Sequence, residues 1–385
     1  MAALATLALT LPGGGARGAY QAGVLSRLGE SFADLDVGII TGVSAGAINA
    51  TYLANHPGSL GPATRDLAAL WAGLDTDHVF RGEPLALMGN AARWSVQLLS
   101  GGNRALPGVR GLVDTAPLRS SLERVLNGPR GELSGVRDKL EAGRLTALAV
   151  TTTSYSTGQS ITFAELSSRR PAIAWQRPYR VGCSALIRVD HVMASAAIPL
   201  LFPAVRVDGT WHGDGGVRQS APLSPALRLG ANRIILISTV RGPTGPAEAA
   251  ERDEQYPSLA RILGVTLNAL LNDHAEYDAA QLRRITELVR ACPDVRSGLS
   301  AADVLLIRPS EDLGEIAAEY EKRLPPAVRY LTRGLGTREF RSTDLLSTLL
   351  FDSAYTARLI ECGRRDAERR IDEVRAFIAA AASSA

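Results

Sequence analysis

The chain has few cysteines, almost no lysine and no strong excess of charge. Cys183, Cys292 and Cys362 are odd in number and widely spaced within the 385 residues. That pattern excludes a disulfide framework and a CxxC metal knuckle, and it favours a reducing compartment. Lysine occurs at only two positions, although lysine and arginine together number 42, which we interpret as a compositional bias. Because 39 acidic residues leave a net charge of only +3, nucleic acid is not expected as the main partner.

Apolar segments of membrane-spanning length are also lacking. The longest nearly apolar run, residues 192–205, contains two prolines and is shorter than the roughly 20 residues that a spanning helix needs. Residues 1–11 are apolar but carry no basic n-region, so they predict a buried strand rather than a signal peptide. With 46% hydrophobic and 21% charged residues, the composition is typical of a soluble globular enzyme, which we expect to be cytoplasmic.

Two strand-loop-helix units open the chain. Residues 4–11 form an apolar run of strand length that ends at a glycine loop, and helical spacing follows over 19–28. A second apolar run at 37–41 leads through another glycine-bounded turn into an alanine-rich stretch that reaches residue 54. Repetition of this unit predicts two parallel strands with helices packed on the sheet.

The rest of the chain alternates strands with helices and ends in helices. Further strands are expected at 145–152, 205–208, 234–239 and 304–307, and helices at 60–99, 114–126, 192–197, 223–229 and 258–289. From residue 313 onward nearly every segment has helical spacing. We therefore predict an α/β domain over residues 1–310 and a helical C-terminal extension over 311–385.

Ser44 is the strongest candidate for a nucleophile. It lies in Gly42-Val43-Ser44-Ala45-Gly46, between a predicted strand and a predicted helix, which is the context of a nucleophile elbow. The flanking glycines allow a sharp turn that leaves the hydroxyl at the start of the helix, where N–H groups stabilise negative charge. Because the same pattern also occurs in ordinary loops, the assignment depends on this context.

The first glycine loop, Gly13-Gly14-Gly15-Ala16-Arg17-Gly18, fits two functions. GxGxxG between a strand and a helix is typical of dinucleotide sites and of anion-binding loops in general. A dinucleotide site needs an acidic residue at the end of the second strand, but that position holds the Ser44 elbow. We therefore expect the loop to donate N–H groups to the oxyanion of an acyl-transfer intermediate, with Gly14 and Gly15 as the main donors.

No histidine offers Ser44 a base in a recognisable sequence context. None of the five histidines fits the order Ser, Asp, His of an α/β-hydrolase triad. Asp214-Gly215-Gly216 instead places a carboxylate on a glycine turn, after a strand-like segment that contains His212. Taken alone, Asp-Gly-Gly is most often an ordinary turn.

The order of these motifs is more specific than any one of them. An apolar strand ending in GGGARG, then GVSAG on the next strand-helix turn, then DGG about 170 residues later resembles the patatin-like phospholipases in content, order and spacing. Residues 193–199 (MASAAIP), with Phe202-Pro203 after them, are similar to the family's segment ahead of the aspartate. The resemblance covers about residues 4–240.

The resemblance implies a three-layer α/β/α fold with a mainly parallel sheet and a Ser-Asp dyad, with no metal and no organic cofactor. In that scheme Ser44 attacks an ester carbonyl and Asp214 accepts its proton. The implied oxyanion hole consists of Gly13, Gly14, Gly15 and Arg17, and the remaining motif glycines are Gly18, Gly42, Gly46, Gly215 and Gly216. Arg17 either orients the glycine loop or meets a phosphate headgroup.

The activity implied by the resemblance is that of a lipid acyl hydrolase of phospholipase A or lysophospholipase type. Its partners are then phospholipids or other acyl esters, with peripheral contact to a membrane. A carboxylesterase, thioesterase or acyltransferase with the same dyad is an alternative, because the sequence does not define the donor or acceptor of the acyl chain. A second alternative is a non-catalytic scaffold that binds a partner through the mixed charges of residues 364–375, although intact Ser44 and Asp214 argue against it.

Residues 192–205 allow two interpretations. Their large apolar side chains and two prolines are typical of a buried turn beneath the catalytic loop. The same side chains could instead form a wall of the acyl pocket. In the second case, alanine at Leu201 or Phe202 is expected to change the chain-length preference.

Overall fold

The structure is a computed structural model that describes most of the chain. The described residues are 6–81, 110–126, 132–219, 221–242, 274–292, 300–324 and 343–382, together with single positions within 89–96 and 262–269. Of the helices predicted from the sequence, most of residues 82–99 and of residues 258–273 lie outside this part.

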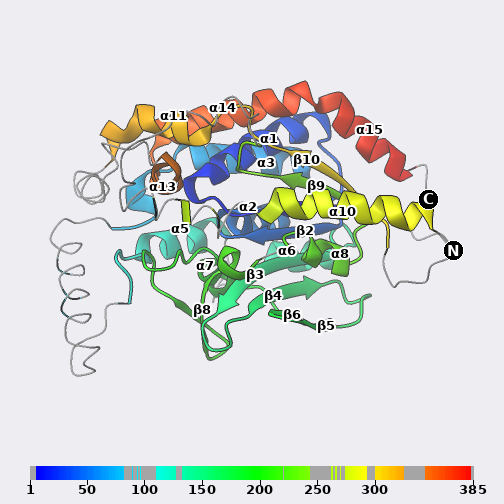
Figure 1. The fold of residues 1–385 in the computed structure, drawn as a ribbon, viewed down its shortest axis with the longest axis horizontal. Coiled ribbons are helices and arrows are strands. Elements are labelled where there is room, and N and C mark those ends of the chain that lie inside the picture. Colours follow the sequence, from blue (N-terminus) through cyan, green and yellow to red (C-terminus); the bar gives the residue numbers. More distant parts are fainter. Residues whose placement is uncertain are drawn as a thin grey trace.

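A mixed sheet forms the middle layer of the described residues (Figure 1). Its strands are β1 (Leu7–Leu11), β2 (Ile39–Val43), β3 (Ala147–Ser154), β4 (Ser160–Leu166), β5 (Ala174–Arg177), β6 (Arg180–Ser184), β7 (Val205–Val207), β8 (Thr210–Asp214), β9 (Arg233–Ile237) and β10 (Asp303–Ile307). The main path is β10-β9-β1-β2-β3-β4-β6-β5, and β8 joins it on β3. The first five strands of this path are parallel, which confirms the predicted β1–β2 unit.

Strands β4, β5 and β6 occupy a region in which we predicted no element. β4 pairs antiparallel with β3, and β5 pairs antiparallel with β6 at the edge of the sheet. β5 is largely exposed, so it has no apolar run. A buried parallel strand gives a clear hydrophobic signal, whereas a half-solvated edge strand does not.

Helices cover both faces of the sheet. One face carries α1 (Gly18–Ser31), α2 (Ala45–Asn55), α3 (Leu60–Ala72), α5 (Ala116–Leu126), α6 (Ser134–Glu141) and α7 (Val189–Ser195). The other carries α8 (Ser224–Arg228) and α10 (His274–Ala291). Side chains alternate between the two faces: Leu7 and Leu9 of β1 contribute to the core beneath α1, whereas Ala8 faces α8 and α10. The fold is therefore the expected three-layer α/β/α arrangement.

The C-terminal helices pack onto this framework. They are α11 (Leu313–Tyr320), α13 (Thr343–Leu349), α14 (Ser353–Arg369) and α15 (Ile371–Ala382), and they cover α1 and α3 at the top of Figure 1. α14 contacts α1 at glycines of both helices, because a Cβ at Gly23 or Gly363 would meet backbone of the other helix. A helical C-terminal region is thus present, while the boundary at residue 310 stays a prediction. Among the described residues, no helix has the length and apolarity to cross a membrane.

Candidate active site

Ser44 occupies a sharp turn between β2 and α2. Its backbone has φ 54° and ψ −128°, a conformation that non-glycine residues rarely adopt and that recurs at functional sites. The turn is possible because Gly46 is small: a Cβ there would overlap the carbonyl oxygens of Leu11 and Pro12. Gly42 likewise packs against the backbone of Gly46. The local geometry is therefore that of a nucleophile elbow.

The register of the sheet brings Ser44 and Asp214 together. β2 pairs with β3 up to Val43 opposite Thr151, and β8 then pairs with β3 from Asp214 opposite Thr152. β4 occupies the other edge of β3 over the same residues, so β2 and β8 lie end to end along one edge. The turn after β2 and the turn after β8 consequently meet at the same point.

Backbone contacts hold the Asp214 turn in place. The Asp214 N–H donates to the Ala197 carbonyl at 3.0 Å, and Oδ1 of Asp214 accepts from the Gly216 N–H at 2.8 Å. Gly215 lies against the ends of β2 and β3, where a Cβ would meet the Thr151 carbonyl oxygen. Oδ2 accepts no hydrogen bond of standard geometry from a described residue, so one carboxylate oxygen is available to accept a proton.

Asp214 is fully buried, and burial changes its acidity. Removal from water raises the pKa of Asp214 from 3.8 to about 6, although the Ser44 hydroxyl and the Gly216 N–H partly oppose this rise by stabilising the charged form. The carboxylate is thus a stronger base than an exposed aspartate and is still mostly ionised at neutral pH. This electrostatic effect depends on the packed fold and is not visible in the sequence.

A second serine supports the elbow. Ser195, at the end of α7, accepts a hydrogen bond from the Ser44 N–H at 2.9 Å and donates to the Thr151 carbonyl at 2.7 Å. Its hydroxyl is fully buried. Because both hydrogen bonds fix this hydroxyl, we assign Ser195 a positioning role that sequence reasoning did not identify.

No imidazole among the described residues hydrogen-bonds to Ser44 or Asp214. His212 is held between the hydroxyls of Thr152 and Thr210, each at 2.8 Å, and burial lowers its pKa. Burial also lowers the pKa of His191, to about 4. His56 pairs with Asp66 at 3.1 Å. In this part of the chain, no three His, Cys, Asp or Glu side chains are grouped so that they could hold a metal ion.

The glycine loop lies beside the elbow. Gly15 lines the same cavity as Ser44, and its φ of 56° favours glycine. The N–H groups of Gly14 and Gly15 donate to no other described residue, which leaves them available for an oxyanion. Gly13 is fixed by a hydrogen bond from the Thr239 hydroxyl to its carbonyl at 2.8 Å.

Arg17 connects this loop to the C-terminal extension. Its buried guanidinium donates to Oδ1 of Asp344 at 2.8 Å and to the Ser347 hydroxyl at 2.9 Å, both in α13. Gly15 approaches the same helix, because a Cβ there would meet the Thr348 carbonyl. Of the two roles considered for Arg17, these contacts favour orientation of the loop over contact with a headgroup.

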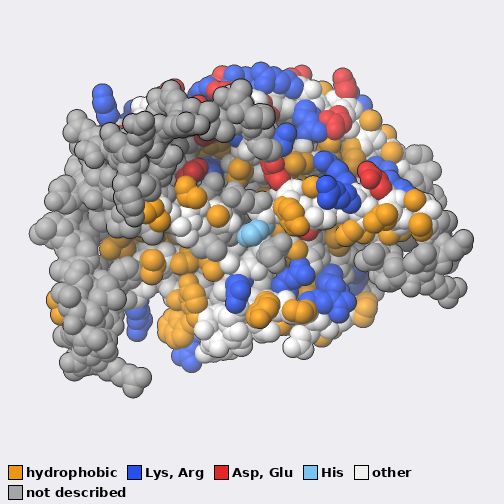
Figure 2. All heavy atoms as spheres, in the orientation of Figure 1, with side chains coloured by type: hydrophobic (Ala, Val, Ile, Leu, Met, Phe, Trp, Pro, Cys, Tyr) orange, Lys and Arg blue, Asp and Glu red, His pale blue; other side chains and the backbone are white. Residues whose placement is uncertain are grey.

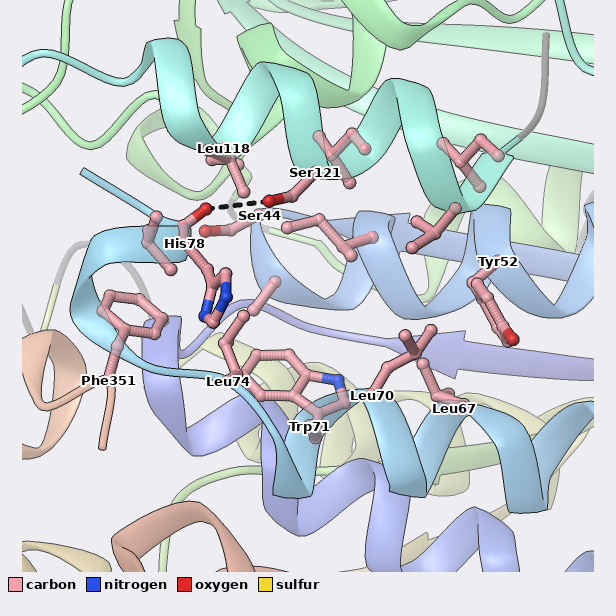
Figure 3. A pocket seen from close by; sticks show the side chains of 18 of the residues that line it. Ser44, Tyr52, Leu67, Leu70, Trp71, Leu74, His78, Leu118, Ser121 and Phe351 are labelled. Atoms are coloured by element: carbon pink, nitrogen blue, oxygen red, sulfur yellow. Dashed lines mark hydrogen bonds between the residues drawn. The ribbon is translucent and has the colours of Figure 1, made fainter. Parts of the chain in front are cut away.

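An apolar cavity of about 220 Å³ opens at Ser44 (Figure 3). It runs along α2 between α3 and α5, from Ser44 and His78 at one end to Tyr52 at the other. Most of its lining is aliphatic or aromatic and includes Leu67, Leu70, Trp71, Leu118, Leu122 and Phe351. A cavity with this lining next to an elbow serine is suited to an acyl chain.

A family model for patatin-like phospholipases matches residues 9–227, which is more than half of the chain. The chain belongs to the patatin-like phospholipase family. This membership confirms the resemblance stated from the three motifs. No curated protein sequence matches the chain at a significant level.

Several solved structures are similar to this patatin-like protein at low identity. Human GIVD cytosolic phospholipase A2 in complex with methyl gamma-linolenyl fluorophosphonate is 13% identical, with a TM-score of 0.45 and coverage of 99% of this chain and 60% of that one. VipD from Legionella pneumophila is 14% identical, with a TM-score of 0.36 and coverage of 96% and 67%. ExoU from Pseudomonas aeruginosa, in its complex with SpcU, is 17% identical, with a TM-score of 0.28 and coverage of 88% and 68%. The chain therefore spans about two thirds or less of these proteins, and we base no functional conclusion on them.

Residues 192–205 contribute to the cavity of this patatin-like protein. Ala196, Ile198 and Phe202 line it, and the Phe202 ring packs against Phe80 with a centroid distance of 5.9 Å. Leu201 packs against the hydrophobic core and is not part of the cavity lining. The structure thus combines the two interpretations of this segment, with Phe202 in the wall and Leu201 outside it.

Phe202→Ala is expected to change the acyl-chain preference. Removing the ring enlarges the cavity, which should favour longer or bulkier chains by about 1–3 kcal/mol in relative kcat/KM. Leu201→Ala, the matched control, should keep the wild-type preference. Measuring kcat/KM over a series of esters of increasing chain length tests this, and a uniform loss across the series in Phe202→Ala would assign that ring to packing alone.

Gly14→Ala is expected to lower kcat by about 10²-fold, because it displaces an N–H group that we expect to donate to the oxyanion. A Cβ at this position would lie 2.7 Å from the Thr239 hydroxyl oxygen, so the loop must shift. Gly209→Ala is a suitable control, since Gly209 also has a positive φ, 86°, but has open space around it on the turn between β7 and β8. A normal kcat in folded Gly14→Ala would place the oxyanion donors elsewhere.

Proposed function

We propose that this protein is a serine lipid acyl hydrolase of phospholipase A or lysophospholipase type that uses Ser44 and Asp214 as a catalytic dyad. The observation that supports this most strongly is a serine on a strained elbow that opens into an apolar cavity, with a buried carboxylate beside it. Ser44 supplies the nucleophile, Asp214 the base, and the cavity the binding site for the acyl chain.

In the acylation step, the Ser44 hydroxyl oxygen attacks the ester carbonyl carbon while its proton passes to Asp214. The N–H groups of Gly14 and Gly15, with the N-terminus of α2, stabilise the resulting oxyanion. The tetrahedral intermediate then expels the alcohol, which takes the proton from Asp214, and leaves an acyl ester on Ser44. For deacylation, a water gives its proton to Asp214, attacks this ester and releases the fatty acid, after which the proton returns to Ser44.

Activity is expected to fall on the acid side of neutral pH. Only the ionised carboxylate accepts a proton, so kcat/KM should decrease tenfold per pH unit below the pKa of Asp214 near 6 and be constant above it. A pH–rate profile with a soluble ester, within the range where the fold is stable, provides the measurement. Full activity that persists to pH 4.5 would contradict a base with this pKa.

The substrate class is tested by direct competition among acyl donors. A phospholipid or lysophospholipid should give the highest kcat/KM, because a long acyl chain makes more contacts with the apolar cavity than a short one. A short p-nitrophenyl ester and an acyl-CoA represent the carboxylesterase and thioesterase alternatives, and added acceptor alcohols represent the acyltransferase. A preference for any of these over the phospholipid would replace the proposed substrate while keeping the dyad.

The scaffold alternative depends on charged residues that the fold already uses. Arg364 pairs with Glu30 of α1 at 2.7 Å, and Arg365 pairs with Glu311. These ion pairs fasten α14 to the rest of the chain. Absence of turnover on every acyl donor, with binding of a protein partner that is lost on disrupting α14, would favour the scaffold.

A further inference from the structure

Three arginines gather on the face of the sheet opposite to α2. Arg177 and Arg180 are direct cross-strand partners on β5 and β6. Trp175, two positions before Arg177, lies over Gly182 of β6 and packs against the core beneath α8. Because side chains alternate along a strand, Arg177 and Arg180 share this face with Trp175. Arg228 of α8 completes the group, with its guanidinium 6.0 Å from the centre of the Trp175 ring.

Ion pairs with carboxylates are missing from this group within the described residues. None of the three forms an ion pair with another described residue, whereas Arg27, Arg119 and Arg364 do. Asp278 of α10 is close enough to interact electrostatically with Arg180, and its carboxylate also accepts a hydrogen bond from the Leu223 N–H at 2.8 Å. Like charges that face each other across two strands are destabilising. Among the described residues, the cluster therefore carries a net positive charge that Asp278 compensates only in part.

One donor of the cluster is also unused. Nη1 of Arg180 is buried and has no hydrogen-bond partner in the described part of the chain, which is costly for a charged group. Burial, and after it the charges of Arg177 and Arg180, lower the pKa of Arg228, as expected for cations held close together. Figure 2 shows basic side chains gathered over the area where β5, β6 and α8 lie in Figure 1. A bound anion would relieve the repulsion among the three guanidinium groups.

We propose that Arg177, Arg180 and Arg228 form a binding site for a phosphate group. Guanidinium groups match the geometry of phosphate oxygens with paired hydrogen bonds, and several of them suit a multiply charged anion. Arg177 and Arg228 are exposed, so a ligand can reach the site from solvent. The phosphate comes either from a lipid headgroup or from a soluble compound. Because the site lies across the sheet from the Ser44 cavity, it is independent of the proposed hydrolysis.

Calorimetric titration with pyrophosphate tests the site directly. The unaltered protein should bind it, and Arg180→Gln and Arg228→Gln should each weaken binding at least tenfold. Two variants are used because, if one of them fails to fold, the other still tests the site. Arg284→Gln removes the same charge from an exposed position on α10 that forms no ion pair with another described residue, and this variant should bind as the unaltered protein does.

Vesicles distinguish the two sources of phosphate. Flotation with phosphatidylglycerol vesicles that depends on Arg180 and Arg228, with no flotation on phosphatidylcholine alone, would assign the site to anionic headgroups. Binding of pyrophosphate without vesicle flotation would assign it to a soluble phosphate compound. No pyrophosphate binding, or binding that Arg180→Gln and Arg228→Gln weaken no more than Arg284→Gln does, would overturn the proposal.

Discussion

Asp214→Asn is expected to reduce kcat about 10⁴-fold while raising the unfolding temperature. An amide cannot accept the Ser44 proton, so the loss should be at the upper end of what a general base contributes. Its carbonyl oxygen can still accept the hydrogen bond from the Gly216 N–H, so the turn after β8 should keep its shape. Steady-state kinetics on one ester and a thermal melt of the same sample measure the two effects.

The gain in stability follows from the sign of the pKa shift. The pKa of Asp214 is higher in the folded protein, about 6, than its ordinary value of 3.8, so folding favours the protonated acid. The ionised carboxylate therefore destabilises the fold at neutral pH by about 3 kcal/mol, since one pKa unit corresponds to about 1.4 kcal/mol. Asn avoids this cost, so the difference in unfolding temperature should be largest above pH 6 and disappear below the ordinary pKa of 3.8.

Histidine variants provide the control for this prediction. His78 is the histidine that lines the Ser44 cavity, and His212 is two positions from Asp214, so these two are the candidates for a triad. With a dyad, His78→Gln and His212→Gln should each lose no more than about 10-fold in kcat, far less than a missing base would cost. A loss in either variant as large as that in Asp214→Asn would refute the dyad.

Ser44→Ala is expected to reduce kcat by roughly 10⁶-fold, to the background rate, because it removes the nucleophile itself. The fold should be unaffected, since the Ser44 contact to Ser195 uses the backbone N–H, which alanine retains. Ser195→Ala is the matched control. It should lower kcat only moderately, because it loosens the elbow and leaves the reacting hydroxyl intact. Comparable losses in the two variants would contradict the assignment of the nucleophile.

The local motifs could be predicted because each is encoded over a few consecutive residues. Strand-turn-helix signals at residues 4–28 and 37–54 are local, and β1, α1, β2 and α2 appear within a few residues of them. Ser44 was identified for the same reason. The Asp214 turn was found only from the order of three motifs, since Asp-Gly-Gly alone is typical of ordinary turns.

The parts that could not be predicted depend on distant contacts. The end-to-end placement of β2 and β8 follows from the register of both on β3, which no local pattern specifies. The cavity takes its lining from α2, α3 and α5, whose apolar faces look like ordinary core faces in the sequence. Arg17 contacts Asp344 across more than 300 positions, and nothing in the sequence around either residue predicts this contact. The raised pKa of Asp214 likewise arises from burial in the finished fold.

The rate at which a fluorophosphonate labels Ser44 tests the dyad most directly. This rate reports the attack by the serine alone, because no product has to be released for the label to remain on the enzyme. Peptide mapping of the unaltered protein should find one adduct, on Ser44, and none in Ser44→Ala. The labelling rate should fall by about 10³-fold or more in Asp214→Asn and stay within 10-fold in His78→Gln and His212→Gln. An adduct on another serine, or labelling of Asp214→Asn at the unaltered rate, would contradict the account.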